Sequence, residues 1–196
     1  MRQTIIILFS ICFGLYASAE DNRSNMEDSV YQTKKKFDYF FLESLRLKEK
    51  SRHSEAFATL QYALKTDSTS SAALALLANY YMFLQQDTLA VEALQKAVKY
   101  SPQNFDYKVS LADIYRETGN IVESTKLYES LVSEQPEKPE LNFYLSELYL
   151  RQNKIEKAIQ SLDALENSIG MNEMLSMQKS KLYLAMNQED KAVGEL

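Results

Sequence analysis

The feature that most constrains the fold of this chain is an internal repeat of 34 residues. Residues 71–104 align without a gap with residues 105–138 and with residues 139–172. Such a period indicates an array of small units, none of which buries its apolar face alone. The recurring positions include Leu77, Ala78, Tyr81, Ala90 and Leu94, which return as Leu111, Ala112, Tyr115, Ser124 and Tyr128, and again as Leu145, Ser146, Tyr149, Ala158 and Leu162.

Each unit has the pattern of two facing amphipathic helices. In residues 71–104, Leu77, Tyr81 and Leu84 share one helical stripe, and the positions from Ala90 to Val98 supply a second one. The small residues Ala78 and Ala90 let the two backbones approach closely, while the large ring of Tyr81 fills the space beside them. Two positions recur in all five units, as Leu47, Tyr81, Tyr115, Tyr149 and Tyr183, and as Ala56, Ala90, Ser124, Ala158 and Ala192.

This pattern resembles the tetratricopeptide repeat (TPR), a helix-turn-helix unit of 34 residues. The resemblance implies an all-α fold, an α-solenoid of antiparallel helix pairs that forms a TPR-like right-handed superhelix. The array spans residues 34–196, with units at 37–70, 71–104, 105–138 and 139–172 and an incomplete unit at 173–196. The first and last units depart most from the family pattern, because Glu43 and Lys179 stand where the other units have leucine.

The turns inside the units carry their own signals. Gly119 lies between the two helices of the third unit, where a left-handed residue closes a helix without a steric penalty. Asn153 and Asn187 occupy the equivalent place and tolerate that conformation. Ser51 and Gln85 suit it less, so we expect their turns to be strained or built differently. Between units, Pro102 and Pro136 are predicted to end a helix, and Pro139 suits the first helical position.

The N-terminal residues 1–19 predict a secretory signal peptide. Arg2 precedes an apolar stretch over residues 5–16, and the small residues Ala17, Ser18 and Ala19 follow. The alternative, an uncleaved membrane anchor, is less favoured because a membrane span needs about 20 apolar residues. Residues 20–33 are polar and are predicted to form a disordered leader. The chain is therefore expected to be exported, to the periplasm, the cell envelope or the extracellular space.

The C-terminal residues 173–196 supply one helix of a fifth unit and only the start of its second helix. A repeat array needs a terminal helix with a polar outer face. We therefore expect a fragment of a longer protein or a shortened gene product, with Tyr183, Leu184 and Met186 incompletely covered; the alternative is that the last turn frays in a complete protein.

Composition excludes several functions. Removal of residues 1–19 takes away Arg2, so 21 basic and 27 acidic residues leave a net charge of −6. An acidic surface disfavours nucleic acid as a partner, and no membrane insertion is expected after signal cleavage. The single histidine, His53, lacks a second metal ligand or a nucleophile pattern nearby, and the glycines are scattered. We therefore expect that the chain has no catalytic residues, no cofactor and no metal, and that it is not an enzyme.

The resemblance places function in a binding groove. In the TPR family the first helix of each unit lines a concave groove, mainly through positions 2, 5, 9, 12 and 13. In this chain, these positions hold a row of apolar residues with acidic residues beside it. The implied partner-binding residues are Phe41, Leu45, Asn79, Met82, Phe83, Val109, Asp113, Arg116, Phe143, Glu147, Leu150 and Arg151.

The resulting hypothesis is a non-catalytic protein–protein interaction scaffold of the bacterial periplasm or cell envelope. Its partner is another protein or a peptide segment with apolar anchors and basic residues beside them. One alternative is the extracytoplasmic sensor or interaction part of a larger membrane signalling protein that continues beyond residue 196. Another is an enzyme whose catalytic domain lies outside this sequence. The sequence gives no oligomeric state.

Overall fold

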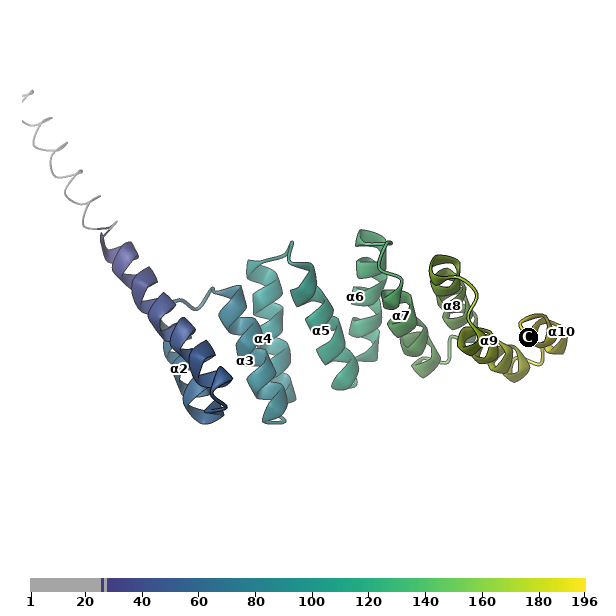
Figure 1. The fold of residues 1–196 in the computed structure, drawn as a ribbon, viewed down its shortest axis with the longest axis horizontal. Coiled ribbons are helices and arrows are strands. Elements are labelled where there is room, and N and C mark those ends of the chain that lie inside the picture. Colours follow the sequence, from purple (N-terminus) through teal and green to yellow (C-terminus); the bar gives the residue numbers. More distant parts are fainter. Residues whose placement is uncertain (1–25, 27) are drawn as a thin grey trace, which may run out of the picture. The chain divides into compact units, whose positions relative to one another are not determined.

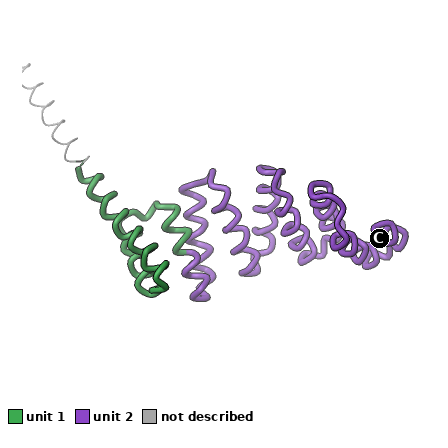
Figure 2. Tube along the Cα trace, in the orientation of Figure 1, with its two compact units in different colours: residues 1–77 green, residues 78–196 purple. Residues whose placement is uncertain are grey.

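The structure, a computed structural model, describes residue 26 and residues 28–196, and all regular elements of these residues are α-helices (Figure 1). This confirms the prediction of an all-α fold. The predicted signal peptide lies outside the described residues. The chain divides into two compact units, residues 1–77 and residues 78–196 (Figure 2), and each is described by itself below.

The described part of the first unit contains a helix over residues 28–49, followed by α2 (His53–Thr66) and the first part of α3 (Ser71–Phe83). Residues 28–33, predicted as part of a disordered leader, are helical here, which corrects that prediction. They extend a packed helix, and each added residue gains one backbone hydrogen bond. The rings of Phe37 and Phe41 stack at 5.5 Å, and Phe40 stacks on Tyr62 of α2 at 5.9 Å.

The second unit contains the end of α3 and seven further helices. They are α4 (Asp87–Tyr100), α5 (Phe105–Glu117), α6 (Ile121–Glu134), α7 (Glu140–Arg151), α8 (Ile155–Ile169), α9 (Glu173–Ala185) and α10 (Glu189–Gly194). From α4 onward each helix packs against the next one in sequence (Figure 1). The predicted repeat limits fall in the connections before α3, α5, α7 and α9, so each predicted repeat contains one helix pair.

The turns inside the five repeats share one geometry. Each contains a residue with a positive φ, between 56° and 82°. In the second repeat, the N–H of Gln85 bonds to the carbonyl of Met82 (3.0 Å), and that of Gln86 bonds to Tyr81 (2.8 Å). This is the Schellman arrangement, which satisfies carbonyls at the helix end. The five residues are Ser51, Gln85, Gly119, Asn153 and Asn187.

The expectation that Ser51 and Gln85 build different turns is therefore wrong. Their φ values, both 57°, match the 58° of Asn153. The repeat register fixes the backbone at these positions, and the two side chains accept a conformation that L-residues disfavour. Strain, the other half of the expectation, remains a prediction.

The connections between repeats use side-chain caps. Asn104 accepts a hydrogen bond from the N–H of Tyr107 (3.0 Å), and Asn172 accepts one from Met174 (3.0 Å). Pro102 and Pro136 each lie two residues beyond the end of a helix, α4 and α6, as predicted. Pro139 has helical dihedral angles but is the capping residue of α7, one position earlier than predicted.

Small buried residues hold the two helices of each repeat together. In the third repeat the hydroxyl of Ser124 donates to the carbonyl of Ala112 (2.8 Å). In the fifth repeat the same contact is reversed, since Ser180 donates to the carbonyl of Ala192 (2.8 Å). Both positions are buried in all five repeats, as Ser44 with Ala56, Ala78 with Ala90, Ala112 with Ser124, Ser146 with Ala158, and Ser180 with Ala192.

The recurring tyrosine connects the third and the fourth repeat to the one before it. Tyr115 of α5 accepts a hydrogen bond from Gln95 of α4 (2.7 Å), and Tyr149 of α7 donates one to Glu129 of α6 (2.6 Å). The residues that contact these hydroxyls, Gln95 and Glu129, are also 34 positions apart. The rings therefore fill the space between helices, as the repeat pattern predicts, and their hydroxyls reach a partner at the edge.

Candidate protein-interaction surface

In the second unit, Arg116 of α5 lies at the centre of a group of charged side chains. Its Nη2 donates to Oδ1 of Asp113 one turn earlier (3.1 Å), and carboxylate oxygens of Glu117 and Glu147 each lie 3.9 Å from the guanidinium. Because Glu147 belongs to α7, the arginine bridges the first helices of two adjacent repeats. Three carboxylates therefore surround one guanidinium group.

An aromatic ring lies against this guanidinium. Arg116 lies over the ring of Tyr144 at 5.4 Å, and the ring of Phe143 meets Tyr144 edge-on at 6.0 Å. The side chain of Arg116 is about four-fifths buried, and its Nε finds no acceptor among the described residues. Partial burial is the largest single effect on Arg116 and lowers its pKa, but the hydrogen bond to Asp113 and the nearby charges of Asp113 and Glu147 together outweigh it and raise the pKa overall.

Asp113 is held from a second direction by Tyr128 of α6. The buried tyrosine donates its hydroxyl hydrogen to Oδ1 of Asp113 (2.7 Å). Burial, and then the bond to the carboxylate, raises the pKa of the Tyr128 hydroxyl. Its ring also lies 5.6 Å from that of Tyr144. Tyr128 and Tyr144 were not predicted as site residues, because Tyr128 recurs at a core position of the repeat and Tyr144 lies outside the groove positions of the family.

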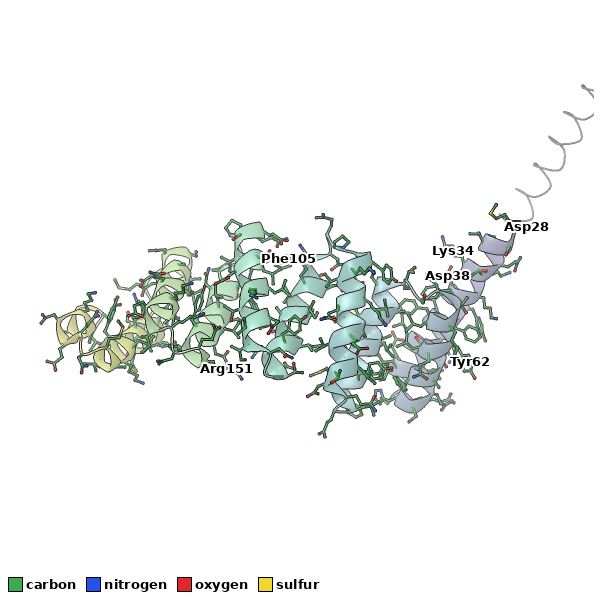
Figure 3. All side chains as sticks on the ribbon, turned by 180° about the vertical axis from the view of Figure 1, so that it is seen from behind. Asp28, Lys34, Asp38, Tyr62, Phe105 and Arg151 are labelled. Carbon is green, nitrogen blue, oxygen red and sulfur yellow. The ribbon has the colours of Figure 1, made fainter. Side chains whose placement is uncertain are left out.

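The structure brings together four of the predicted residues: Asp113, Arg116, Phe143 and Glu147, which we call the α5–α7 surface. Arg151 (labelled in Figure 3) joins it, because its Nη1 donates to the carbonyl of Arg116 (3.2 Å). The surface thus combines fixed charges with one ring that is 39% exposed, Phe143.

The other predicted residues lie apart from this cluster. Val109 and Leu150 are half-buried and pack against the core of the second unit, which leaves them less available than their repeat positions imply. Phe83 is 78% exposed near the end of α3. Asn79 is exposed and Met82 half-buried on the same helix, and in the first unit Phe41 and Leu45 are half-buried.

A second charged cluster, not predicted from the sequence, centres on Lys179 of α9. This lysine is only 3% exposed. Its Nζ lies 2.9 Å from Asp163 and 2.7 Å from Glu166, both on α8, and 2.7 Å from Glu195, which follows α10. Burial alone lowers the pKa of Lys179, but the hydrogen bonds to the three carboxylates outweigh it and raise the pKa. The cluster ties α10 to the two helices before it.

A third feature was missed although the repeat register points to it. On α9, Met174 (65% exposed), Met177 (45%) and Leu184 (53%) are large apolar residues open to solvent. With the exposed Lys181 they occupy repeat positions 2, 5, 9 and 12 of the fifth repeat. These four residues are called the methionine stripe below. Carrying the groove positions one repeat further would have found them.

Little in the described residues points to other chemistry. His53 is the exposed first residue of α2. No cluster of three or more metal-binding side chains occurs in residues 26 and 28–196. In the same part of the chain, no helix is long and apolar enough to span a bilayer. Two open cavities, of about 470 Å³ beside residues 29–38 and about 300 Å³ beside residues 87–92, are lined by none of the predicted groove residues.

Successive helix pairs, the equivalent turns and the recurring tyrosine contacts define the class of protein: this is a helical-repeat protein. Comparison with protein families gives two matches. The family described as tetratricopeptide repeat matches residues 115–177, and the family of ChAPs (Chs5p-Arf1p-binding proteins) matches residues 47–131. The first of these matches confirms the predicted resemblance to the tetratricopeptide repeat. Comparison with the curated proteins gives no match.

Solved structures support the predicted fold. A crystal structure of MamA protein has 15% identity and a TM-score of 0.71, covering 82% of this chain and 87% of that one. MamA from Desulfovibrio magneticus RS-1 has 14% identity and a TM-score of 0.68, covering 82% and 90%. YrrB, described as a TPR protein with an unusual peptide-binding site, has 15% identity and a TM-score of 0.69, covering 86% and 87%. At such identities the likeness shows the fold alone, a TPR-like α-solenoid.

Proposed function

We propose that this protein is a non-catalytic scaffold that binds a segment of another protein across the α5–α7 surface. TPR-type folds generally serve as protein-interaction scaffolds, and YrrB, of similar fold, is described as having a peptide-binding site. The observation that carries the proposal is the exposed ring of Phe143 beside a fixed group of charges. An aromatic anchor surrounded by oriented polar groups is the composition of a binding hot spot.

The charges of the α5–α7 surface indicate which residues a partner segment would carry. Asp113, Glu117 and Glu147 face one guanidinium directly, and Arg151 contributes a second one at the carbonyl of Arg116. The side chains of Asp113 and Glu147 remain 34% and 46% exposed, so both can accept further hydrogen bonds. The excess of carboxylates favours a partner segment with an apolar anchor and a basic residue beside it.

A photo-crosslinking amino acid placed at Phe143 tests the proposal in living cells. We expect a discrete adduct with one partner protein, because Phe143 would lie against the bound segment. Adding Glu147→Lys should reduce that adduct, since the substitution reverses one charge without entering the core. Val122 of α6, 50% exposed, is the matched control position. Equal adducts from both positions, or an adduct that Glu147→Lys leaves unchanged, contradict the assignment.

The proposed setting is the bacterial periplasm or cell envelope. Its support comes from the sequence alone: Arg2, the apolar residues 5–16 and the small residues at 17–19. Expression of the full chain in a Gram-negative host, cell fractionation and N-terminal sequencing test it. We expect a periplasmic product that begins at Glu20. A cytoplasmic product that retains residues 1–19 contradicts the proposed export.

A further inference from the structure

The methionine stripe is an apolar face of α9 that the repeat does not bury. Met174, Met177, Lys181 and Leu184 are spaced by three or four residues, which places them on one side of the helix. The residues that α9 buries, Leu175, Lys179 and Ser180, lie elsewhere on the helix. The stripe therefore faces away from the contact with α8, and three large apolar side chains on it are about half exposed or more.

The stripe continues the row of positions that forms the α5–α7 surface. Met177 has the repeat position of Phe143, and Lys181 has the position of Asp113 and Glu147. Along this row the charge changes sign, from carboxylates on α5 and α7 to an ammonium group on α9. At repeat position 9, a segment lying across the row thus meets a cation only at α9.

Lys181 has no ion-pair partner within residues 26 and 28–196. The residues three and four positions away are Met177, Gln178, Leu184 and Ala185, none of which is acidic. An apolar ligand that covered Met177 and Leu184 would also remove water from this ammonium group. Such desolvation is unfavourable unless the ligand supplies a carboxylate.

We propose that the methionine stripe binds an amphipathic helix of the partner protein, with a carboxylate in its apolar face that pairs with Lys181. The inference rests on the proposed function, because the same row of first helices would hold the same partner. Flexible methionine side chains adapt to apolar helices of differing shape. Apolar anchors three or four residues apart are the means by which a helix is recognised along such a face.

The experiment uses two fluorescent peptides of about five helical turns that differ only at the centre of their leucine face, where one carries Glu and the other Lys. Anisotropy titration with the mature chain should show about tenfold tighter binding of the Glu peptide. Lys181→Glu should reverse that preference. Lys96→Glu, the same charge change at an exposed site on α4, should leave it unchanged. Replacing Met174 and Met177 by Ser should weaken both peptides equally.

Binding without charge preference, a preference that Lys181→Glu does not alter, or no binding of either peptide would overturn the inference. Binding to vesicles of anionic lipid with the same dependence on Met174 and Met177 would also overturn it, because the stripe would then be a membrane contact. These failures differ from a failure of the proposed function. A Phe143 adduct that persists alongside an inert methionine stripe would leave the α5–α7 surface as the binding site and remove α9 from it.

Discussion

At the scale of single residues, the position in the repeat sets the backbone conformation of each turn, and the residue types found there suit that conformation to different degrees. Gly119 is free to adopt the positive φ that its turn requires, whereas Gln85 and Ser51 adopt it at 57°. A left-handed conformation costs an L-residue roughly 1–2 kcal/mol. The side chains of Gln85 and Ser51 are both exposed, so packing against the core does not require either residue type.

Gln85→Gly should therefore stabilise the protein. Relief of the left-handed backbone outweighs the added freedom of the unfolded chain, for a net gain of about 0.5–1 kcal/mol. Thermal unfolding followed by circular dichroism should show a midpoint raised by a few degrees, and Ser51→Gly should behave alike. Gln86→Gly is the control, because φ of Gln86 is −101° and glycine there only adds unfolded-state entropy. A lower midpoint for Gln85→Gly would show that the turn carries no strain.

Tyr128→Phe should cost on the order of 1 kcal/mol at pH about 8, because Asp113 loses a hydrogen bond from a buried donor. The cost should shrink at alkaline pH. The folded protein holds the pKa of this hydroxyl above its ordinary 10.0, so above pH 10 the tyrosine ionises in the unfolded state first. The wild type then loses stability as pH rises, and the phenylalanine variant lacks this term. Urea unfolding at several pH values measures the difference, and a constant difference would contradict the raised pKa.

At the scale of helices, much of the fold could be predicted because the repeat gives many aligned positions. The small buried pairs and the helix limits before α3, α5 and α9 follow from the 34-residue register. The site was less predictable. Position 12 identified Arg116, but only coordinates show that Glu147 and Tyr144 of another repeat hold it. Val109 also occupies one of the groove positions of the repeat, and yet it packs against the core.

Lys179 shows where prediction from the sequence fails. It was recognised as a departure, since the equivalent residues in three other repeats are Leu77, Leu111 and Leu145. Its burial depends on Asp163 and Glu166, three residues apart on α8, and on Glu195, which follows α10. Helical spacing brings Asp163 and Glu166 together, but nothing in the sequence shows that Glu195 joins them at Lys179, and the chain has 27 acidic residues from which to choose.

Lys179→Met should loosen α10 selectively. The substitution leaves three carboxylates without their shared cation, which destabilises this end by up to about 3 kcal/mol, and by less where water reaches the carboxylates. Hydrogen exchange should show lost protection in α10 and the second half of α9, with α5 and α6 unchanged. Lys181→Met, an exposed change on the same helix, should leave protection intact. Unaltered exchange in α10 for Lys179→Met would mean that the cluster does not hold it.

At the scale of the whole molecule, the most extensive contacts of the second unit are between helices that are neighbours in sequence, α4 with α5, α5 with α6, and so on to α10, while Arg116 and Arg151 also link α5 to α7. The stability of such an array is approximately a sum of repeat stabilities and nearest-neighbour interfaces. Loss of one interface should then be felt locally, in contrast to a globular domain that unfolds as one.

Two leucine-to-alanine substitutions distinguish these behaviours. Leu148 of α7 and Leu60 of α2 are both fully buried, and they belong to different compact units. Each change should cost about 2–5 kcal/mol. If the array is coupled only between neighbours, Leu148→Ala should lower hydrogen-exchange protection in α6 to α8 while α2 keeps its own, and Leu60→Ala should do the reverse. Equal loss of protection along residues 28–196 in both variants would show instead that the repeats unfold as one cooperative unit.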